Sequence, residues 1–249
     1  MAGHSKWANV KHRKAREDAK RGKLFTRILR EVTVAARLGG GDPDANPRLR
    51  NAIDDARSNN VPNDNIERAI KKGTGELEGG ALEEIVLEGY GPHGVAVLVE
   101  AVTDNRNRTV SEIRNLFSRG GGNLGESGCV AWMFDRRGYF AFDRDAMTED
   151  EAMELALEVG AEDFEAADEQ YEMYTSVDAY HPILEALEER GVEIAAKELD
   201  MVPQSYVAVG AQDAPQTLRL MEALEDHDDT QNVWANFDVD ENVLAEQEA

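Results

Sequence analysis

Apolar residues in the first part of the chain recur at steps of three and four positions, which is the period of an amphipathic helix. Between about residues 15 and 38 the apolar positions share one arc of the helix, and an adjoining arc gathers basic residues. The apolar positions are Leu24, Phe25, Ile28, Leu29, Val32, Ala35 and Ala36, and the basic ones are Lys20, Lys23, Arg27, Arg30 and Arg37. The pattern predicts a helix with one packed face and one basic face.

Cap and turn residues divide this region into three helices. Three glycines at 39–41 end the first helix, and Asn46 followed by Pro47 has the order of a cap and a first-turn proline. Asp64 and Glu67 have the spacing of a capping box for a third helix, which Gly73 ends. The sequence therefore predicts a small bundle of three short helices.

The pattern changes after the glycine-rich stretch at 73–80. Residues 84–90 alternate between apolar and polar, and residues 95–102 form a nearly continuous β-branched run, so both are predicted to be strands. The predicted order is strand 84–90, turn 91–94, strand 95–102, helix 109–119, a glycine loop at 120–125 and strand 130–134.

The following segment alternates strands and helices in the order βαββαβ, which is the signature of a ferredoxin-like module. The predicted elements are strand 139–142, helix 149–159, strands 163–165 and 171–177, helix 182–190 and strand 193–199. A strand at 206–209, a helix at 215–224 and a strand at 232–237 then supply the half that the second region lacks. We therefore expect an α+β protein with a three-helix domain and two ferredoxin-like α/β modules, the third domain being inserted into the second. The predicted domains are 1–78, 79–135 with 203–241, and 136–202.

The bases are concentrated at one end of an acidic chain. The protein has 249 residues and a formal net charge of −23. Its first thirty residues nevertheless contain ten Lys or Arg and two acids, residues 31–75 are balanced, and the rest contains all the excess acid. Most of such a molecule repels a polyanion, and one end attracts it. The asymmetry favours a nucleic acid as partner, bound by the N-terminal region.

The composition, with 41% hydrophobic and 31% charged residues, is that of a folded protein of two or three domains. No apolar run approaches the roughly 20 residues of a membrane span, and the N-terminus lacks a secretory signal, so we expect a cytoplasmic protein. A mitochondrial transit peptide is disfavoured because the basic stretch continues without a break into the predicted helix. The single cysteine, Cys129, cannot form an internal disulfide, and its apolar neighbours predict a buried thiol.

Six motifs stand out in the first 135 residues. They are MAGHSKWANVKHRK at 1–14, VAARLGGGDPDANPRLRN at 34–51, NIERAIKK at 65–72, EGYG at 88–91, TDNRNRT at 103–109 and GGNLG at 121–125. The acidic stretch EDHDDTQNV at 225–233 adds a weaker match. Together they resemble the YebC/PmpR family. The resemblance implies a cytoplasmic regulator with a helical domain and two α/β domains. Some members are described as DNA-binding transcriptional regulators and others, including the mitochondrial translational activator of cytochrome oxidase, as ribosome-associated translation factors.

The basic segment and helix form the main candidate site for nucleic acid. Phosphate neutralisation needs flexible cations in a row, and the segregation of the bases disfavours the alternative of an ordinary solvated helix face. Trp7 could stack on a base or anchor the segment to the helices, and both interpretations stay open. The candidates in this region are Lys6, Trp7, Lys11, His12, Arg13, Lys14, Arg16, Lys20, Lys23, Arg27, Arg30 and Arg37.

Arg106 and Arg108 form a second candidate site, because they lie at a predicted helix N-terminus, where free N–H groups favour anions. Alternatively, Arg108 pairs with Glu112 one turn later and Arg106 pairs with a nearby carboxylate. The helix-then-strand order around the glycines at 120–125 is the reverse of a P-loop and favours a helix stop. The acids and histidine at 225–229 are interpreted as a solvated turn rather than a metal site.

No catalytic, metal or cofactor signature is present in the sequence, so we expect a non-enzymatic protein. We expect a nucleic-acid-binding regulator, in the first place a DNA-binding transcriptional regulator, that contacts mainly the phosphate backbone. The alternative is a ribosome-associated translation factor that binds ribosomal RNA, with its acidic domains against basic ribosomal proteins. Neither a membrane nor a small-molecule substrate is expected.

Overall fold

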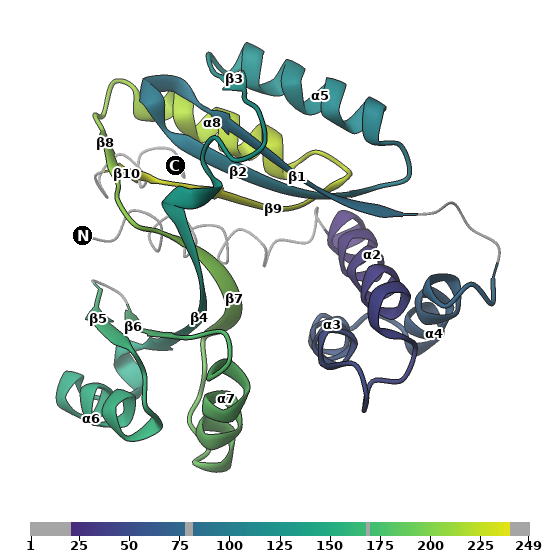
Figure 1. The fold of residues 1–249 in the computed structure, drawn as a ribbon. Helices are drawn as coiled ribbons and strands as arrows, with labels where there is room; N and C mark the ends of the chain where they lie inside the picture. The colour runs from purple at the N-terminus through teal and green to yellow at the C-terminus, as the bar shows by residue number, and fades with distance from the viewer. Residues whose placement is uncertain (1–20, 78–81, 168–169, 240–249) are drawn as a thin grey trace. The chain divides into compact units, whose positions relative to one another are not determined.

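The structure is a computed structural model that describes residues 21–77, 82–167 and 170–239 of the chain. The described residues form two compact units (Figure 1). The inserted unit is Trp132–Tyr206, and the main unit comprises the described residues up to Ala131 and from Val207 onward. The predicted helix start near residue 15 lies outside the described residues.

Three helices open the described part of the main unit, as the apolar period predicts. They are α2 (Arg21–Gly39), α3 (Pro47–Ser58) and α4 (Asn63–Gly73). Their shared core contains Ile28, Val32, Ala35, Ala36, Leu49, Ala52, Ile53, Ala56, Val61, Ile66 and Ala69. α4 approaches α2 closely at Gly73, where a Cβ atom would lie 2.3 Å from the backbone oxygen of Thr33. A side chain at this position would separate the two helices.

The predicted cap of the second helix is confirmed. Asn46 is 5% exposed, and its Oδ1 accepts a hydrogen bond from the backbone N–H of Leu49 at 3.2 Å. Its Nδ2 donates to the backbone oxygens of Ala35 and Gly40, each at 2.8 Å. The same side chain therefore caps the start of α3 and ties it to the backbone at the end of α2.

The predicted capping box of the third helix is wrong. α4 begins at Asn63, and its N-cap residue is Pro62, which makes no side-chain cap hydrogen bond. The backbone oxygen of Pro62 instead accepts from the N–H groups of Asn65 and Ile66. Because the helix starts at Asn63, Asp64 lies inside its first turn and is not the N-cap residue.

The four-stranded sheet of the main unit carries two helices (Figure 1). Its strands are β1 (Glu83–Tyr90), β2 (Ala96–Thr103), β3 (Asn123–Leu124) and β9 (Thr230–Ala235), in the order β3-β1-β2-β9 with antiparallel pairs. α5 (Arg106–Arg119) and α8 (Ala214–Glu225) lie side by side against it. A parallel pair, β8 (Val207–Val209) and β10 (Phe237–Val239), follows the inserted unit in the chain.

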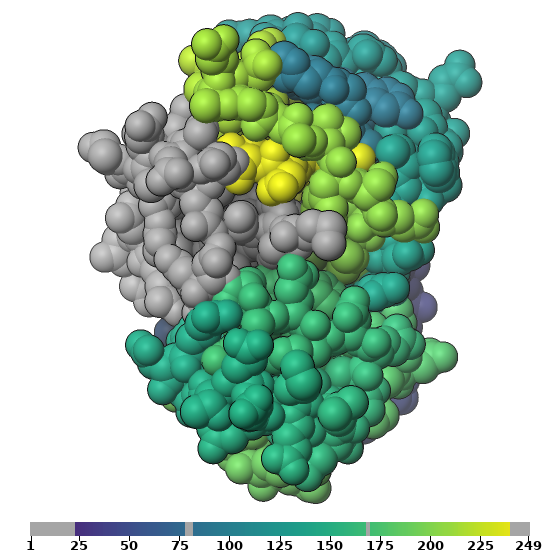
Figure 2. Space-filling model, turned by 90° about the vertical axis from the view of Figure 1, so that its left-hand side faces the viewer, coloured from purple at the N-terminus to yellow at the C-terminus, as the bar shows by residue number. Residues whose placement is uncertain are grey.

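The inserted unit has the strand order that the sequence predicts. Its elements are β4 (Phe134–Asp143), α6 (Glu149–Val159), β5 (Asp163–Ala166), β6 (Gln170–Thr175), α7 (Tyr180–Glu189) and β7 (Ala196–Pro203). The sheet order β5-β6-β4-β7, antiparallel throughout, is that of a ferredoxin-like module. In the space-filling view this unit is a closely packed body, coloured teal to green (Figure 2). The predicted α+β class, with helices followed by two α/β modules, is confirmed. The sheet of the main unit has a different strand order, β3-β1-β2-β9, because its first two strands, β1 and β2, pair directly as a hairpin.

The prediction of a separate strand at 130–134 is wrong, and Glu88 explains why. The carboxylate of Glu88, a residue that is 5% exposed, accepts hydrogen bonds from the backbone N–H groups of Gly128, Val130 and Ala131 at 2.6–2.8 Å. These donors are therefore not available to a strand ladder, and Ala131–Met133 forms a 3₁₀ helix before β4. Cys129 in this loop is only half-buried, which corrects the prediction of a buried thiol.

Two further boundaries differ because side chains of asparagine decide them. α5 starts three residues before its predicted position, since Oδ1 of Asn105 accepts from the backbone N–H of Arg108 at 3.1 Å. The predicted strand 232–237 is divided at Asn236, whose Oδ1 accepts from the backbone N–H of Ala96 at 2.7 Å. The backbone oxygen of Asn236 accepts from Val207 at 2.7 Å, so the chain leaves β9 and enters the β8–β10 pair.

We predict that Asn46→Ala lowers the free energy of unfolding by about 2 kcal/mol, because it removes an N-cap and the two hydrogen bonds from Nδ2 to the backbone oxygens of Ala35 and Gly40. Ser58→Ala, at the exposed end of α3, is the control and is expected to cost less than about 0.5 kcal/mol. Urea denaturation at neutral pH measures both. Equal losses in the two variants would contradict the role given to Asn46.

We predict that Glu88→Gln lowers the free energy of unfolding by about 2 kcal/mol, because one acceptor oxygen becomes a donor that faces backbone N–H groups. Burial raises the pKa of Glu88, but the hydrogen bonds from Gly128, Val130 and Ala131 lower it more, so its net pKa is lowered. The stabilisation is therefore present above the ordinary carboxyl pKa and is lost as the pH falls below it. Glu126→Gln, an exposed change in the same loop, should show neither effect in urea denaturation between pH 3 and 7.

Candidate nucleic-acid interface

The basic residues predicted to bind nucleic acid fall into two groups. Eight candidates lie outside the described residues: Lys6, Trp7, Lys11, His12, Arg13, Lys14, Arg16 and Lys20. The other six are described, with Lys23, Arg27, Arg30 and Arg37 on α2 and Arg106 and Arg108 on α5.

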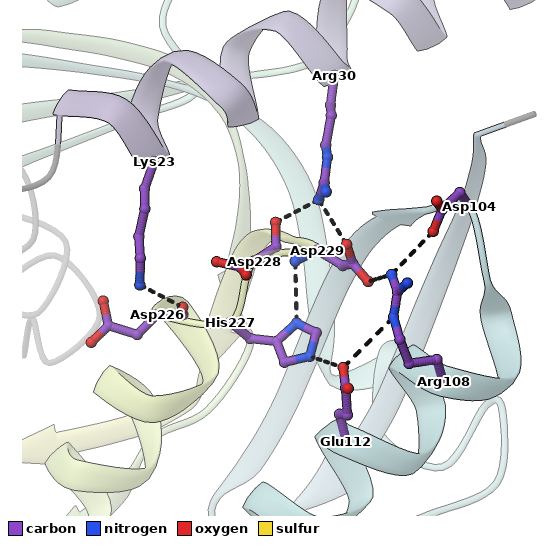
Figure 3. Close-up of a pocket in the computed structure, with 9 residues that line it drawn as sticks. All are labelled: Lys23, Arg30, Asp104, Arg108, Glu112, Asp226, His227, Asp228 and Asp229. Atoms are coloured by element: carbon purple, nitrogen blue, oxygen red, sulfur yellow. Dashed lines mark hydrogen bonds and ion pairs between the residues drawn. The ribbon is translucent and has the colours of Figure 1, made fainter. Parts of the chain in front are cut away.

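The basic face of α2 is turned toward oxygen atoms of the main unit. Near the start of α2, Nζ of Lys23 donates to the backbone oxygen of Asp226 at 3.1 Å (Figure 3). At the other end of the helix, Nη1 of Arg37 donates to the backbone oxygen of Leu82, just before β1. Lys23, Arg30 and Arg37 of this face therefore contact the α/β part of the unit, while the apolar face packs against α3 and α4.

Arg30 makes the most extensive of these contacts. Its Nη1 lies 2.9 Å from Oδ1 of Asp229 and also donates to the backbone oxygens of Asp228 and, at 3.3 Å, Val102. The side chain of Arg30 is 22% exposed and that of Asp229 is 3% exposed. Three oxygen acceptors thus surround one nitrogen of a guanidinium that the sequence places among the phosphate-binding candidates.

Arg108 approaches the same carboxylate from the opposite side. Its Nη2 lies 2.7 Å from Oδ2 of Asp229 and 3.1 Å from Oδ1 of Asp104, and its Nε lies 3.9 Å from Glu112. These charges raise the pKa of Arg108, with the hydrogen bond to Asp229 as the largest cause. Within the described residues, Arg108 is thus paired with carboxylates, as the alternative interpretation of the sequence expects.

Arg106, the other candidate at the start of α5, is only loosely paired. Its Nη1 lies 3.8 Å from Oε2 of Glu83 at the start of β1, and both side chains are about half exposed. A surface pair at this distance contributes little to stability. The structure therefore does not bring Arg106 and Arg108 together on one anion site, because each pairs with different carboxylates.

Asp229 is the centre of this arrangement. Oγ1 of Thr109 donates to its Oδ2 at 2.6 Å, and Thr109 is itself held by Oγ1 of Thr103 at 2.8 Å. Burial raises the pKa of Asp229, but the hydrogen bonds from Thr109 and Arg108 and the charges of Arg30 and Arg108 lower it more, to about 2. Asp229 is therefore ionised at neutral pH, and each of its oxygens has a cationic partner.

His227 holds the turn that carries Asp229. Its Nδ1 accepts a hydrogen bond from the backbone N–H of Asp229 at 3.2 Å, and its Nε2 lies 3.0 Å from Oε2 of Glu112 on α5. This pattern fits a neutral imidazole with its proton on Nε2, assigned from its partners. The interpretation of residues 225–229 as a solvated turn is wrong for Asp229, which is 2% exposed.

A hollow of about 590 Å³ lies between α2, the start of α5 and the turn after α8 (Figure 3). It is lined by Lys23, Arg30, Asp104, Arg108, Glu112, Asp226, His227, Asp228 and Asp229. Five carboxylates outnumber three cations here, so the hollow in this state repels an added anion. Among the described residues, no group of His, Cys, Asp and Glu is arranged to hold a metal ion.

Comparison with known proteins agrees with this architecture. Residues 5–76 match the TACO1/YebC protein N-terminal domain, and residues 82–237 match the TACO1/YebC second and third domain. The chain belongs to the TACO1/YebC family. The family resemblance of the sequence motifs is thereby confirmed.

Curated TACO1/YebC relatives are similar to this chain over nearly its whole length. One from Trichlorobacter lovleyi is 56% identical and covers 96% of each chain, and one from Chlorobaculum tepidum is 54% identical and covers 98% of each. Both are named as probable transcriptional regulatory proteins. The crystal structure of a conserved hypothetical protein from Aquifex aeolicus has a TM-score of 0.83 at 49% identity and covers 90% of this chain and 93% of that one. None of the described helices is long and apolar enough to cross a membrane.

We predict that the free energy of unfolding depends on the ionisation of Asp229. Because its pKa is about 2 in the folded protein and near 3.8 in the unfolded chain, the carboxylate contributes about 2 kcal/mol above pH 4. This contribution is lost as the pH falls from about 4 toward 2.

Urea denaturation of wild type and Asp229→Asn over that pH range checks the prediction. The difference between the two proteins should be at least about 2 kcal/mol at pH 6 and should narrow as the pH falls. Asp228→Asn is the matched control, because only the backbone oxygen of Asp228 takes part in the contacts with Arg30. A difference that stays constant with pH would contradict the prediction.

Proposed function

We propose that the protein is a non-enzymatic, nucleic-acid-binding regulator of gene expression, and that it binds DNA through residues 1–20 and α2. The observation that carries this proposal is the position of the bases. Ten Lys or Arg lie in the first thirty residues of a chain whose net charge is −23. A DNA duplex, with about one charge per 1.7 Å of its axis, is attracted to that region and repelled elsewhere.

The proposed contact residues lie in residues 1–20, on α2 and at the start of α5. They are Lys6, Trp7, Lys11, His12, Arg13, Lys14, Arg16, Lys20, Lys23, Arg27, Arg30, Arg37, Arg106 and Arg108. The cations would contact mainly phosphates, because the sequence contains no helix-turn-helix, zinc or RNP motif that reads bases. Backbone contacts of this kind give affinity and a steep salt dependence, with little sequence discrimination.

The regulatory part of the proposal is supported by relatives that are more than 50% identical and are named as probable transcriptional regulatory proteins. We propose a cytoplasmic location, no cofactor and neither a membrane nor a small-molecule partner. We also propose that the chain has three domains, 1–78, 79–135 with 203–241, and 136–202. In this division the helical domain contacts DNA, and the acidic domains act as spacers or bind proteins.

Retention of promoter fragments by the purified full-length protein, with ribosomes removed, tests whether DNA is the nucleic acid that is bound. Retention of promoter fragments that falls steeply with salt is the expected result. A protein that retains no fragment, but travels with ribosomes at low salt and leaves them at high salt, would overturn the choice of DNA in favour of ribosomal RNA.

We predict that changing Lys11, Lys14, Arg16 and Lys20 together to Gln weakens binding to a DNA duplex and flattens its salt dependence. Each lost phosphate contact lowers the slope of log K against log salt by about 0.9, so four lost contacts lower it by about 3.6. Fluorescence anisotropy with a labelled duplex measures the slope.

The matched control changes four bases of the inserted unit to Gln, namely Arg136, Arg137, Arg190 and Lys197. Arg190 and Lys197 already pair with Glu158 and Glu188. This control should keep the wild-type slope. If the slopes of the two variants fall equally, the proposed contact region is wrong.

A further inference from the structure

The acidic turn that follows α8 lies on the basic face of α2, which is the face proposed to bind phosphate. We propose that this turn, residues 226–229, is an autoinhibitory element that occupies Lys23 and Arg30 until nucleic acid displaces it. The inference rests on the proposed function, because it concerns regulation of the same site.

The protein oxygens that contact Arg30 take the place that the oxygens of a phosphate group would take. A guanidinium binds a carboxylate or a phosphate through N–H donors to anionic oxygens at similar distances. In the free protein the anionic oxygen is Oδ1 of Asp229, at 2.9 Å, and the backbone oxygens of Asp228 and Val102 complete the set. Arg30 therefore cannot bind a phosphate fully unless Asp229 gives up its place.

Lys23, which precedes Arg30 on α2, also forms a hydrogen bond with this turn. Its Nζ donates to the backbone oxygen of Asp226, and the side chains of Asp226 and Asp228 add negative charge nearby. The turn thus contacts two of the α2 cations at once. A phosphate approaching either cation is repelled by the turn as well as excluded from the occupied donors.

The turn can release Arg30 without leaving a buried charge unpaired. Only Oδ1 of Asp229 contacts Arg30, whereas Oδ2 keeps Arg108 at 2.7 Å and Thr109 at 2.6 Å. An isolated buried carboxylate would be costly, but this one keeps a cation and a hydroxyl donor. His227 also keeps the turn attached to α5 through Glu112. Opening therefore breaks the Arg30 contacts and leaves the rest of the turn intact.

Arg48 keeps the helices attached while Arg30 changes partner. Its guanidinium pairs with Glu31 of α2 at 2.7 Å and with Glu84 of β1. Because the side chain of Arg30 is 22% exposed, its guanidinium needs to move only toward the solvent to meet a phosphate. In this exchange residues 226–229 move away from Lys23 and Arg30, while Arg48 keeps α2 attached to the sheet.

The experiment compares three full-length variants in fluorescence anisotropy with a labelled mixed-sequence DNA duplex. Asp229→Asn removes the competing charge and should raise the affinity about tenfold and steepen the salt slope by about 1, since Arg30 becomes available. Asp228→Asn removes an equal charge from the same turn but leaves the Arg30–Asp229 pair, and should change the affinity less than about twofold. Thr109→Val weakens the hold on Asp229 without removing its charge and should keep the wild-type slope.

A cross-link keeps the test decisive if Asp229→Asn fails to fold. Lys23→Cys and Asp226→Cys in a Cys129→Ser background carry thiols where the two segments meet, and a short cleavable thiol cross-linker joins them. Closing the link should lower the affinity about tenfold relative to the same protein before cross-linking, and cleavage should restore it.

The outcomes separate this inference from the proposed function. If wild type binds with a steep salt dependence, but both the folded Asp229→Asn variant and the cross-linked protein bind as wild type does, the autoinhibitory turn is wrong and the function stands. If Asp228→Asn raises the affinity as much as Asp229→Asn, the gain comes from the lower negative charge of the turn rather than from release of Arg30. The proposal of an autoinhibitory turn is then also wrong. If neither wild type nor Asp229→Asn binds any duplex, both proposals fail.

Discussion

The carboxylate of Asp229 joins two distant parts of the main unit, because it pairs with a cation from each of them. A carboxylate that is 3% exposed is stable only when its charge is compensated. Arg30 of α2 compensates one oxygen, and Arg108 and Thr109 of α5 compensate the other. The pair with Arg30 therefore orients α2 against the turn before β9, and with it the basic face of the helical bundle.

The elements that the sequence predicts well are those that short-range chemistry decides. The apolar period of α2, the Asn46–Pro47 cap and the order of strands and helices in the inserted unit depend on residues close together in the chain. The failures have long-range causes. Glu88 binds the N–H groups of Val130 and Ala131 in a predicted strand some forty positions later, and Asp229 is buried by residues about 120 and 200 positions earlier. No local spacing signals either carboxylate, so the candidate cations could be found from the sequence, but Asp229 as the shared partner of Arg30 and Arg108 could not.

Internal pairing also changes the meaning of the charge asymmetry. A row of cations on one helix face is attractive to nucleic acid only to the extent that its donors are available. In the described residues, Lys23, Arg30 and Arg37 of α2 all donate to oxygens of the same unit. Under the proposed function, the bases of α2 thus contribute both to the fold and to the attraction of a polyanion, and these two roles compete for the same N–H groups.

Competition of this kind is possible because carboxylate and phosphate are chemically similar ligands for arginine. The protein oxygens hold Arg30 through one carboxylate and two carbonyls, at an effective concentration fixed by the fold. A nucleic acid offers many phosphates and releases counterions when it binds, so it gains where several cations are engaged together. An isolated phosphate lacks that advantage and meets the five carboxylates of the hollow. Under the proposed autoinhibition, the acidic turn favours binding of long polyanions over small ones, which is a discrimination that the basic face alone would not provide.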